Sequence, residues 1–78
     1  MMHAAPLTSP RLARVLRLLA DNRPHSTRDI ARRTHVLAIS ACVAELRQNG
    51  AVIRCRRERV GDKWVFFYTM TKVPSDNG

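Results

Sequence analysis

The arginine side chains carry the most evident chemistry of this chain. Its 78 residues include 14 lysines and arginines against six acidic residues, which gives a formal net charge of +8. Twelve of the 14 basic residues are arginine. A planar guanidinium donates two parallel hydrogen bonds to phosphate, and an excess of positive charge attracts polyanions. The composition therefore favours a phosphate-rich partner.

Two other groups of residues resemble reactive sites in composition only. His25, Ser26 and Asp29 are the types of a hydrolytic trio, but Ser26 and Asp29 at this spacing are typical of a helix cap. Cys42 and Cys55 have neither CxxC spacing nor a nearby histidine pair, so we expect two small buried thiols rather than a zinc site or disulfide framework. We expect no enzyme activity, no metal and no cofactor, and no small-molecule ligand is indicated.

The length allows one domain with a modest core. We predict this domain over 9–72, between a flexible N-terminal arm, 1–8, and a flexible C-terminal tail, 73–78. No apolar run approaches the ~20 residues of a membrane span. The first residues also lack the basic region and apolar stretch of a secretory signal. We therefore expect no membrane partner and a cytoplasmic, nucleoid-associated protein.

Two short helices are expected in the first half of the domain. Ser9 and Pro10 are typical of a helix start. Apolar residues then recur at the spacing of one buried helical face, namely Leu12, Val15, Leu16 and Leu19. A second helix is expected over about 27–33, where Ser26 would cap it and Asp29 would return the capping hydrogen bond.

A third helix is expected over about 37–49, after a tight turn at 34–36. Its inward residues are Ile39, Val43 and Leu46, with Cys42 at the edge of that face. Gly50 lies where a left-handed residue ends a helix. Each of the three helices has a single apolar face to bury, so together they are expected to form a compact unit.

The apolar period changes to two after Gly50. Arginine alternates with other residues in 51–60, aromatic and β-branched residues fill 63–72, and Gly61-Asp62 between them is a two-residue hairpin turn. This turn sets the cross-strand partners: Ile53 with Met70 and Cys55 with Tyr68 on the inward face, Arg57 with Phe66 and Arg59 with Trp64 towards the tip, and Arg56 with Phe67 and Glu58 with Val65 on the other face. The two pairs near the tip are expected to make cation–π contacts.

The order of these elements resembles the winged helix-turn-helix superfamily. The residues that carry the resemblance are Ile30-Ala31, Val36, Ile39, Val43, Leu46-Arg47, Gly50, Ile53 and a basic hairpin ending in Tyr68-Thr69-Met70. The helix end of leucine, arginine, two residues and glycine is similar to that of small phage and prophage helix-turn-helix proteins. The resemblance covers about 9–72 and implies an α+β winged helix, a three-helix core followed by a two-stranded antiparallel β-hairpin wing. It departs at His35, where glycine is frequent.

The resemblance implies duplex DNA as the partner, with two kinds of contact. The outward face of the third helix would enter the major groove, and its base-contacting residues are Ser40, Ala41, Ala44, Arg47 and Gln48. The second helix and the wing would hold the backbone through Arg28, Arg32, Arg33, His35, Arg54, Arg56, Arg57, Arg59 and Lys63. We expect strong, salt-sensitive binding with modest base readout, and a solvated face at Arg11, Arg14 and Arg17.

Several functions remain open at this point. The leading hypothesis is a phage or prophage transcriptional regulator, with a host protein such as RNA polymerase as a second partner. An excisionase-like factor that bends DNA is the first alternative. A protein-interaction module is the second, because the face of Leu37, Ala41 and Ala44 is apolar. Val65, Phe67 and Leu37 are candidates for association with a partner or in a homodimer. RNA is less favoured, since Tyr68 and Phe66 are expected to point inward.

Overall fold

The structure is a computed structural model that describes residues 9–74. The predicted arm, 1–8, and residues 75–78 of the predicted tail lie outside the described residues. The elements follow in the order α1 (Pro10–Leu19), β1 (His25–Ser26), α2 (Thr27–Thr34), α3 (Ile39–Gln48), β2 (Val52–Val60) and β3 (Lys63–Lys72). The expected α+β class is confirmed: the described residues form three helices and a three-stranded antiparallel sheet.

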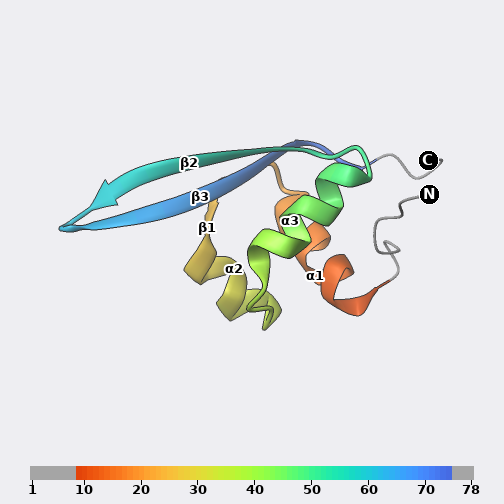
Figure 1. Ribbon diagram of the computed structural model, residues 1–78, viewed down its shortest axis with the longest axis horizontal. Coiled ribbons are helices and arrows are strands. Elements are labelled where there is room, and N and C mark those ends of the chain that lie inside the picture. The colour runs from red at the N-terminus through yellow and green to blue at the C-terminus, as the bar shows by residue number, and fades with distance from the viewer. Residues whose placement is uncertain (1–8, 75–78) are drawn as a thin grey trace.

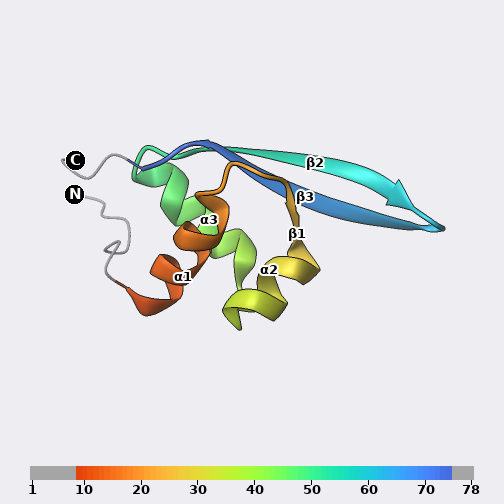
Figure 2. The same ribbon diagram turned by 180° about the vertical axis from the view of Figure 1, so that it is seen from behind.

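The helices cover one face of the sheet at one end of the molecule, and the β2–β3 hairpin extends beyond them (Figure 1). The reverse view shows the same projection, with α1 in front of α3 (Figure 2). This arrangement makes the molecule elongated, with extents of 43 × 24 × 22 Å. The distal part of the hairpin therefore stands in solvent on both of its faces.

The core lies between the helices and the base of the hairpin. Its buried members are Leu12, Val15, Leu19, Ile30, Val36, Ile39, Cys42, Val43, Leu46, Ala51, Ile53, Tyr68 and Met70. Two predictions about it need correction. Leu16, expected in the buried face of α1, is only partly buried, whereas Cys42, expected at an edge, is fully buried. Burial also raises the pKa of the Cys42 thiol.

The helix starts differ in part from the predicted caps. Ser26 caps α2 as expected, with its Oγ accepting from the Asp29 N–H at 3.0 Å. The Asp29 carboxylate does not return this bond, because it is hydrogen-bonded to His25 and Arg33 instead. The side chain of Ser9 makes no capping bond, and its carbonyl accepts from the Ala13 N–H at 2.8 Å. Proline at the first helical position presets φ for this turn.

The turn between α2 and α3 is left-handed at His35, whose φ is 59°. Thr34 stabilises this turn, since its Oγ1 donates to the Ile30 carbonyl and accepts from the Val36 N–H. α3 begins two residues later than predicted, so Leu37 lies in the turn and not on the helix.

The end of α3 agrees with the prediction. Gly50 has a φ of 98°, the left-handed region that favours glycine. The Gly50 N–H donates to the Arg47 carbonyl and the Ala51 N–H to the Leu46 carbonyl, both at 3.0 Å. These two bonds form a Schellman motif, and the buried Ala51 packs into the core just before β2.

The sheet contains one strand more than the predicted hairpin. All the predicted cross-strand partners of β2 and β3 are confirmed, from Ile53 with Met70 to Arg59 with Trp64. β1 was not predicted: it pairs with the outer edge of β3, His25 opposite Tyr68 and Ser26 opposite Phe67, which gives the strand order β1-β3-β2. Two residues are too short to show a period in the sequence. β1 joins the start of α2 to the sheet.

Candidate nucleic-acid interface

Arginine residues lie on both faces of the projecting hairpin. Its inner face, on the helix side, carries Ile53, Cys55, Arg57 and Arg59 of β2 and Trp64, Phe66, Tyr68 and Met70 of β3. Its outer face carries Arg54, Arg56, Glu58, Val65, Phe67 and Thr69. All the hairpin arginines and Lys63 are exposed. Among residues 9–74, the cations of Arg54, Arg57, Arg59 and Lys63 form no ion pair.

Arg56 differs from the other hairpin arginines. Its Nη2 lies 2.6 Å from Oε2 of Glu58, two residues along the same strand face. Arg56 therefore has a nearby counter-charge, unlike the other hairpin arginines. Both side chains are largely exposed, and exposed pairs are weak, so a phosphate could replace Glu58 as the partner of Arg56.

Of the two cation–π contacts predicted near the tip, that of Arg59 with Trp64 is confirmed and that of Arg57 with Phe66 is not. The Cζ atom of Arg57 lies 4.5 Å from the Trp64 ring centroid, and that of Arg59 lies 5.8 Å from it. Arg57 thus contacts its diagonal neighbour Trp64 rather than Phe66 directly opposite. Phe66 is 46% exposed, and Cys55 is exposed as well. Both residues lie on the inner face as predicted. Phe66 is exposed because the helices do not extend that far along the hairpin, whereas Cys55 is exposed on β2 although it lies directly opposite the buried Tyr68.

The three arginines of α2 are exposed, and two of them surround one carboxylate. Arg33 Nε donates to Oδ1 of Asp29 at 3.0 Å, and Arg32 Nη2 lies 3.7 Å from the same atom. Arg28 forms no ion pair among the described residues. His35 is exposed at the left-handed turn that follows. The three exposed arginines make α2 a second cationic area.

A charged network connects this helix to the loop after α1. Nδ1 of His25 lies 3.0 Å from Oδ2 of Asp29, and Nε2 lies 2.9 and 3.0 Å from the carboxylate oxygens of Asp21. Both ring nitrogens donate when the imidazole is protonated. Burial disfavours that charge, but the hydrogen bonds to Asp29 and Asp21 outweigh it and raise the pKa of His25.

The two carboxyl groups shift in the opposite direction. The N–H of Arg23 and then His25 lower the pKa of Asp21, and His25 and then Arg33 lower the pKa of Asp29. A raised folded-state pKa means that the His25 contribution to stability is fully present below its unfolded value of 6.5 and is lost as pH rises through the higher folded value. The two carboxylates contribute to stability at pH values above their unfolded-state pKa of 3.8. This contribution is lost as the pH falls through their lowered folded-state pKa values.

This network should make the effect of His25→Gln depend on pH. We expect the substitution to lower the free energy of unfolding by about 1 kcal/mol more at pH 5.5 than at pH 9, because a charged hydrogen bond is lost only where His25 is protonated. Urea unfolding followed by circular dichroism at both pH values measures the difference. An equal loss at pH 5.5 and pH 9 would contradict a charged His25.

The same geometry bears on the hydrolytic trio suggested by composition. His25 contacts Asp29 through Nδ1, but its other nitrogen is engaged by Asp21, and Ser26 Oγ accepts from the Asp29 N–H. His25 is therefore not positioned to take a proton from Ser26. Within residues 9–74, no three His, Cys, Asp or Glu side chains are grouped to hold a metal ion. The helices of that part of the chain are too short to cross a membrane.

The base-contacting residues predicted on α3 are all exposed: Ser40, Ala41, Ala44, Arg47 and Gln48. Arg47 has a structural contact as well, since its Nη2 donates to the Ile53 carbonyl at 2.6 Å and so links α3 to β2. Any base contact by Arg47 must use its remaining N–H groups. Leu37, in the preceding turn, is 91% exposed. Glu45 of the same helix lies 3.6 Å from Arg11 of α1.

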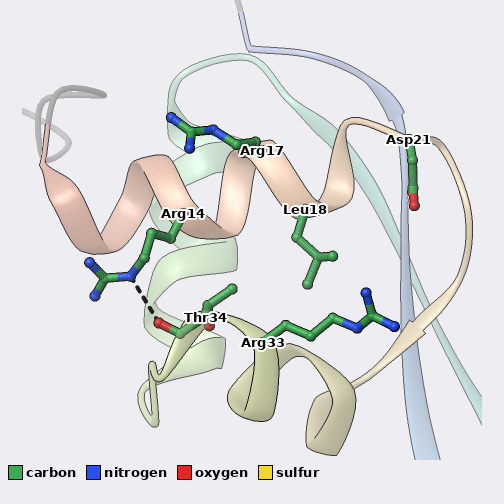
Figure 3. Close-up of a pocket in the computed structure, with 6 residues that line it drawn as sticks. All are labelled: Arg14, Arg17, Leu18, Asp21, Arg33 and Thr34. Carbon is green, nitrogen blue, oxygen red and sulfur yellow. Dashed lines mark hydrogen bonds between the residues drawn. The ribbon is translucent and has the colours of Figure 1, made fainter.

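The arginines of α1 are less uniformly solvated than predicted. Arg11 makes the ion pair with Glu45, and Arg14 Nε donates to the Thr34 carbonyl at the end of α2 at 2.8 Å. Arg17 is exposed. A shallow groove between α1 and α2 is lined by Arg14, Arg17, Leu18, Asp21, Arg33 and Thr34. Figure 3 shows its three guanidinium groups pointing in different directions, so they do not converge on one ligand position.

The association residues predicted on the hairpin are only partly available. Val65 and Phe67 are half-buried, whereas the large apolar residues exposed in the described chain are Leu37, Val52, Val60, Trp64, Phe66 and Val73. Trp64 and Phe66 share the inner face with two unpaired arginines. Reasoning from the sequence missed this surface, although the predicted register already placed these four residues together.

Comparisons with protein-family models, with curated proteins and with solved structures found no match to this chain.

Proposed function

We propose that this chain is a small winged helix-turn-helix protein that binds duplex DNA, with the β2–β3 hairpin as its wing and α3 in the major groove. The observation that carries the proposal is the hairpin itself. It extends beyond the helices and bears Arg54, Arg57, Arg59 and Lys63, whose cations have no acidic partner among residues 9–74. The order of helices and strands, with the strand order β1-β3-β2, is compatible with a winged-helix layout.

The proposed DNA contacts divide by chemistry. Hairpin and α2 cations would bind phosphates, which supply affinity without reading sequence. The side chains of Arg32 and Arg33 are 76% and 62% exposed, and Asp29 would keep His25 as a partner if they turned to a phosphate. On α3, Gln48 can pair with adenine, and Ala41 can pack on a thymine methyl. Small α3 side chains make shape-dependent recognition by a hairpin arginine in the minor groove an additional source of selectivity.

The biological role that we propose is a transcriptional regulator of the phage or prophage type, associated with the nucleoid. An excisionase-like architectural role uses the same contacts and differs in bending the DNA. Circular-permutation gel shifts distinguish the two roles, because bending changes mobility with the position of the binding site. A sharp bend would favour the architectural role.

The first test is a salt series of fluorescence anisotropy titrations on duplex DNA, single-stranded DNA and duplex RNA. Of these three nucleic acids, we expect duplex DNA to bind most tightly. Contact with about 4–7 phosphates should give a log–log salt slope of about −4 to −6 on the duplex. Negligible binding to every nucleic acid at low salt would overturn the proposal.

A single observation favours a second candidate, a module that binds a protein. Leu37, in the turn before α3, is 91% exposed, and Ala41 and Ala44 are exposed on the helix that follows, so these three residues offer apolar surface to a partner protein. In that case Leu37→Ala would weaken the complex, whereas charge reversal on the hairpin would leave it intact.

A further inference from the structure

The inner face of the hairpin changes from buried to exposed beyond Tyr68. Tyr68 is 9% exposed, but the next two inner-face residues of β3 are far more open, Phe66 at 46% and Trp64 at 54%. β1 pairs only with Phe67 and Tyr68, so no third strand lies beside this distal part. Two aromatic side chains therefore present ring surface to solvent on a face that the helices leave uncovered.

Cations accompany these rings. Arg57 and Arg59 lie on the same face, with their Cζ atoms 4.5 and 5.8 Å from the Trp64 centroid. None of the inner-face positions is acidic, because Glu58 lies on the outer face and Asp62 in the turn. The four residues Arg57, Arg59, Trp64 and Phe66, which we call the stacking face, thus combine exposed π surface with uncompensated positive charge.

We propose that the stacking face binds unpaired nucleobases, so that the protein prefers duplex DNA adjoining unpaired bases to fully paired duplex. This inference rests on the proposed DNA-binding function and specifies the kind of DNA. Aromatic side chains stack on bases of any sequence, and arginine binds the flanking phosphates. Within an intact duplex the faces of internal bases are covered by their neighbours, so the indole of Trp64 needs a base whose face is free.

Charge argues against a second copy of the chain as the occupant. Two stacking faces placed together would bring four guanidinium groups into one apolar contact without any carboxylate. Like charges in an interface cost several kcal/mol. A nucleotide offers the complementary set, a flat ring for Trp64 and Phe66 and an anionic phosphate for Arg57 and Arg59.

The cation–π contacts also orient the indole before binding. Arg57 and Arg59 restrict the ring of Trp64, which lowers the entropy lost when a base stacks on it. Neither arginine forms an ion pair among the described residues, so each can donate N–H groups to a phosphate while its guanidinium stays at the ring. The hairpin can then reach unpaired bases next to the duplex that the helices contact.

The test compares two labelled DNAs with equal numbers of phosphates, a short blunt duplex and a shorter duplex with a single-stranded tail. We expect the tailed DNA to bind about 10-fold more tightly, in the range of a stacked base. Trp64 is the only tryptophan of the chain, so its fluorescence should be quenched by the tailed DNA and much less by the blunt one.

Substitutions test whether the stacking face causes the preference for tailed DNA. Trp64→Leu should reduce the preference to within about 2-fold by removing the stacking ring. Phe66→Leu should weaken both the preference and the quenching, with Trp64 still present as a reporter. Val60→Ala is the matched control near the tip, since Val60 is also exposed, at 53%, and it should keep the wild-type preference. Circular dichroism checks that each variant is folded.

Each result has one meaning. Equal affinity for both DNAs, or a preference that survives Trp64→Leu, overturns the stacking face and leaves duplex binding in place. Failure to bind either DNA overturns the proposed function together with this inference. A dimer of the free protein that dissociates in Trp64→Leu would overturn it in favour of a second copy.

Discussion

Replacing Arg57 and Arg59 by glutamate should lower the affinity for duplex DNA by about 100-fold at about 0.1 M salt. Each lost phosphate contact removes about 0.9 from the log–log salt slope, which corresponds to about 8-fold at this salt concentration. Two contacts account for most of the loss, and repulsion by the new carboxylates adds the remainder. The salt slope itself should become shallower by about 2. Anisotropy titrations at several salt concentrations measure both quantities.

The matched control reverses the same number of charges elsewhere. Arg17 and Arg23 are exposed, on α1 and in the loop that follows it, and lie outside the predicted DNA contacts. Arg17→Glu with Arg23→Glu should weaken binding only through the changed net charge and leave the slope nearly unaltered. If the two double variants lose affinity and slope equally, the hairpin makes no specific backbone contact and the binding is diffuse.

The register of the hairpin could be predicted because a single local feature determines it. The two-residue turn at Gly61-Asp62 sets one cross-strand pair, and every other pair follows in steps of one residue. The end of α3 is equally local, since the Schellman motif at Gly50 is contained within residues 46–51. Features of this kind need no knowledge of the rest of the fold.

The exposure of hairpin residues could not be predicted in the same way. Alternation shows which face Cys55 and Phe66 occupy, but burial depends on how far the helices extend along that face. The helices cover Tyr68 but cover neither Phe66, farther along β3, nor Cys55, opposite Tyr68 on β2, so both residues are exposed although their face is correct. The prediction that Phe66 points inward gave the correct face of the hairpin, but Phe66 is not buried.

β1 and the His25 network depend on tertiary contact. Pairing of His25 with Tyr68 joins segments more than forty residues apart, and no local pattern indicates it. Once this strand forms, His25 lies between Asp21 and Asp29, and the Asp29 carboxylate is drawn away from the expected capping box. The Asp29 carboxylate is thus bound by His25 and Arg33, each four residues away, instead of by the Ser26 N–H.

The sequence predicted which residue types form the candidate site better than it predicted their contacts. The Arg56–Glu58 pair had a sequence signal, because residues two apart on a strand share a face. The bond of Arg47 to the Ile53 carbonyl had none, since it depends on the direction of β2 after the Schellman turn. Arg47 therefore changes from a purely base-contacting candidate to a residue that also holds α3 to β2.

The largest effect on stability is expected from Leu46→Ala. Leu46 is fully buried where α3 meets the strands, and its carbonyl accepts from the Ala51 N–H in the Schellman motif. Removing three carbons from a buried leucine costs about 2–5 kcal/mol, because the cavity collapses only in part. A domain of this size has only about 3–10 kcal/mol in total, so the variant should be partly unfolded at 37 °C. Urea unfolding followed by circular dichroism measures the loss, since Trp64 at the exposed tip reports poorly on the core.

Leu37→Ala makes the same chemical change at a residue that is 91% exposed, and it should cost less than about 0.5 kcal/mol. The contrast tests where the core lies, because both leucines precede or occupy α3 and differ chiefly in burial. A loss at Leu37 comparable with that at Leu46 would mean that Leu37 packs against something in solution. The turn before α3 would then be an interface, and the protein-binding candidate would gain over DNA as the explanation of that surface.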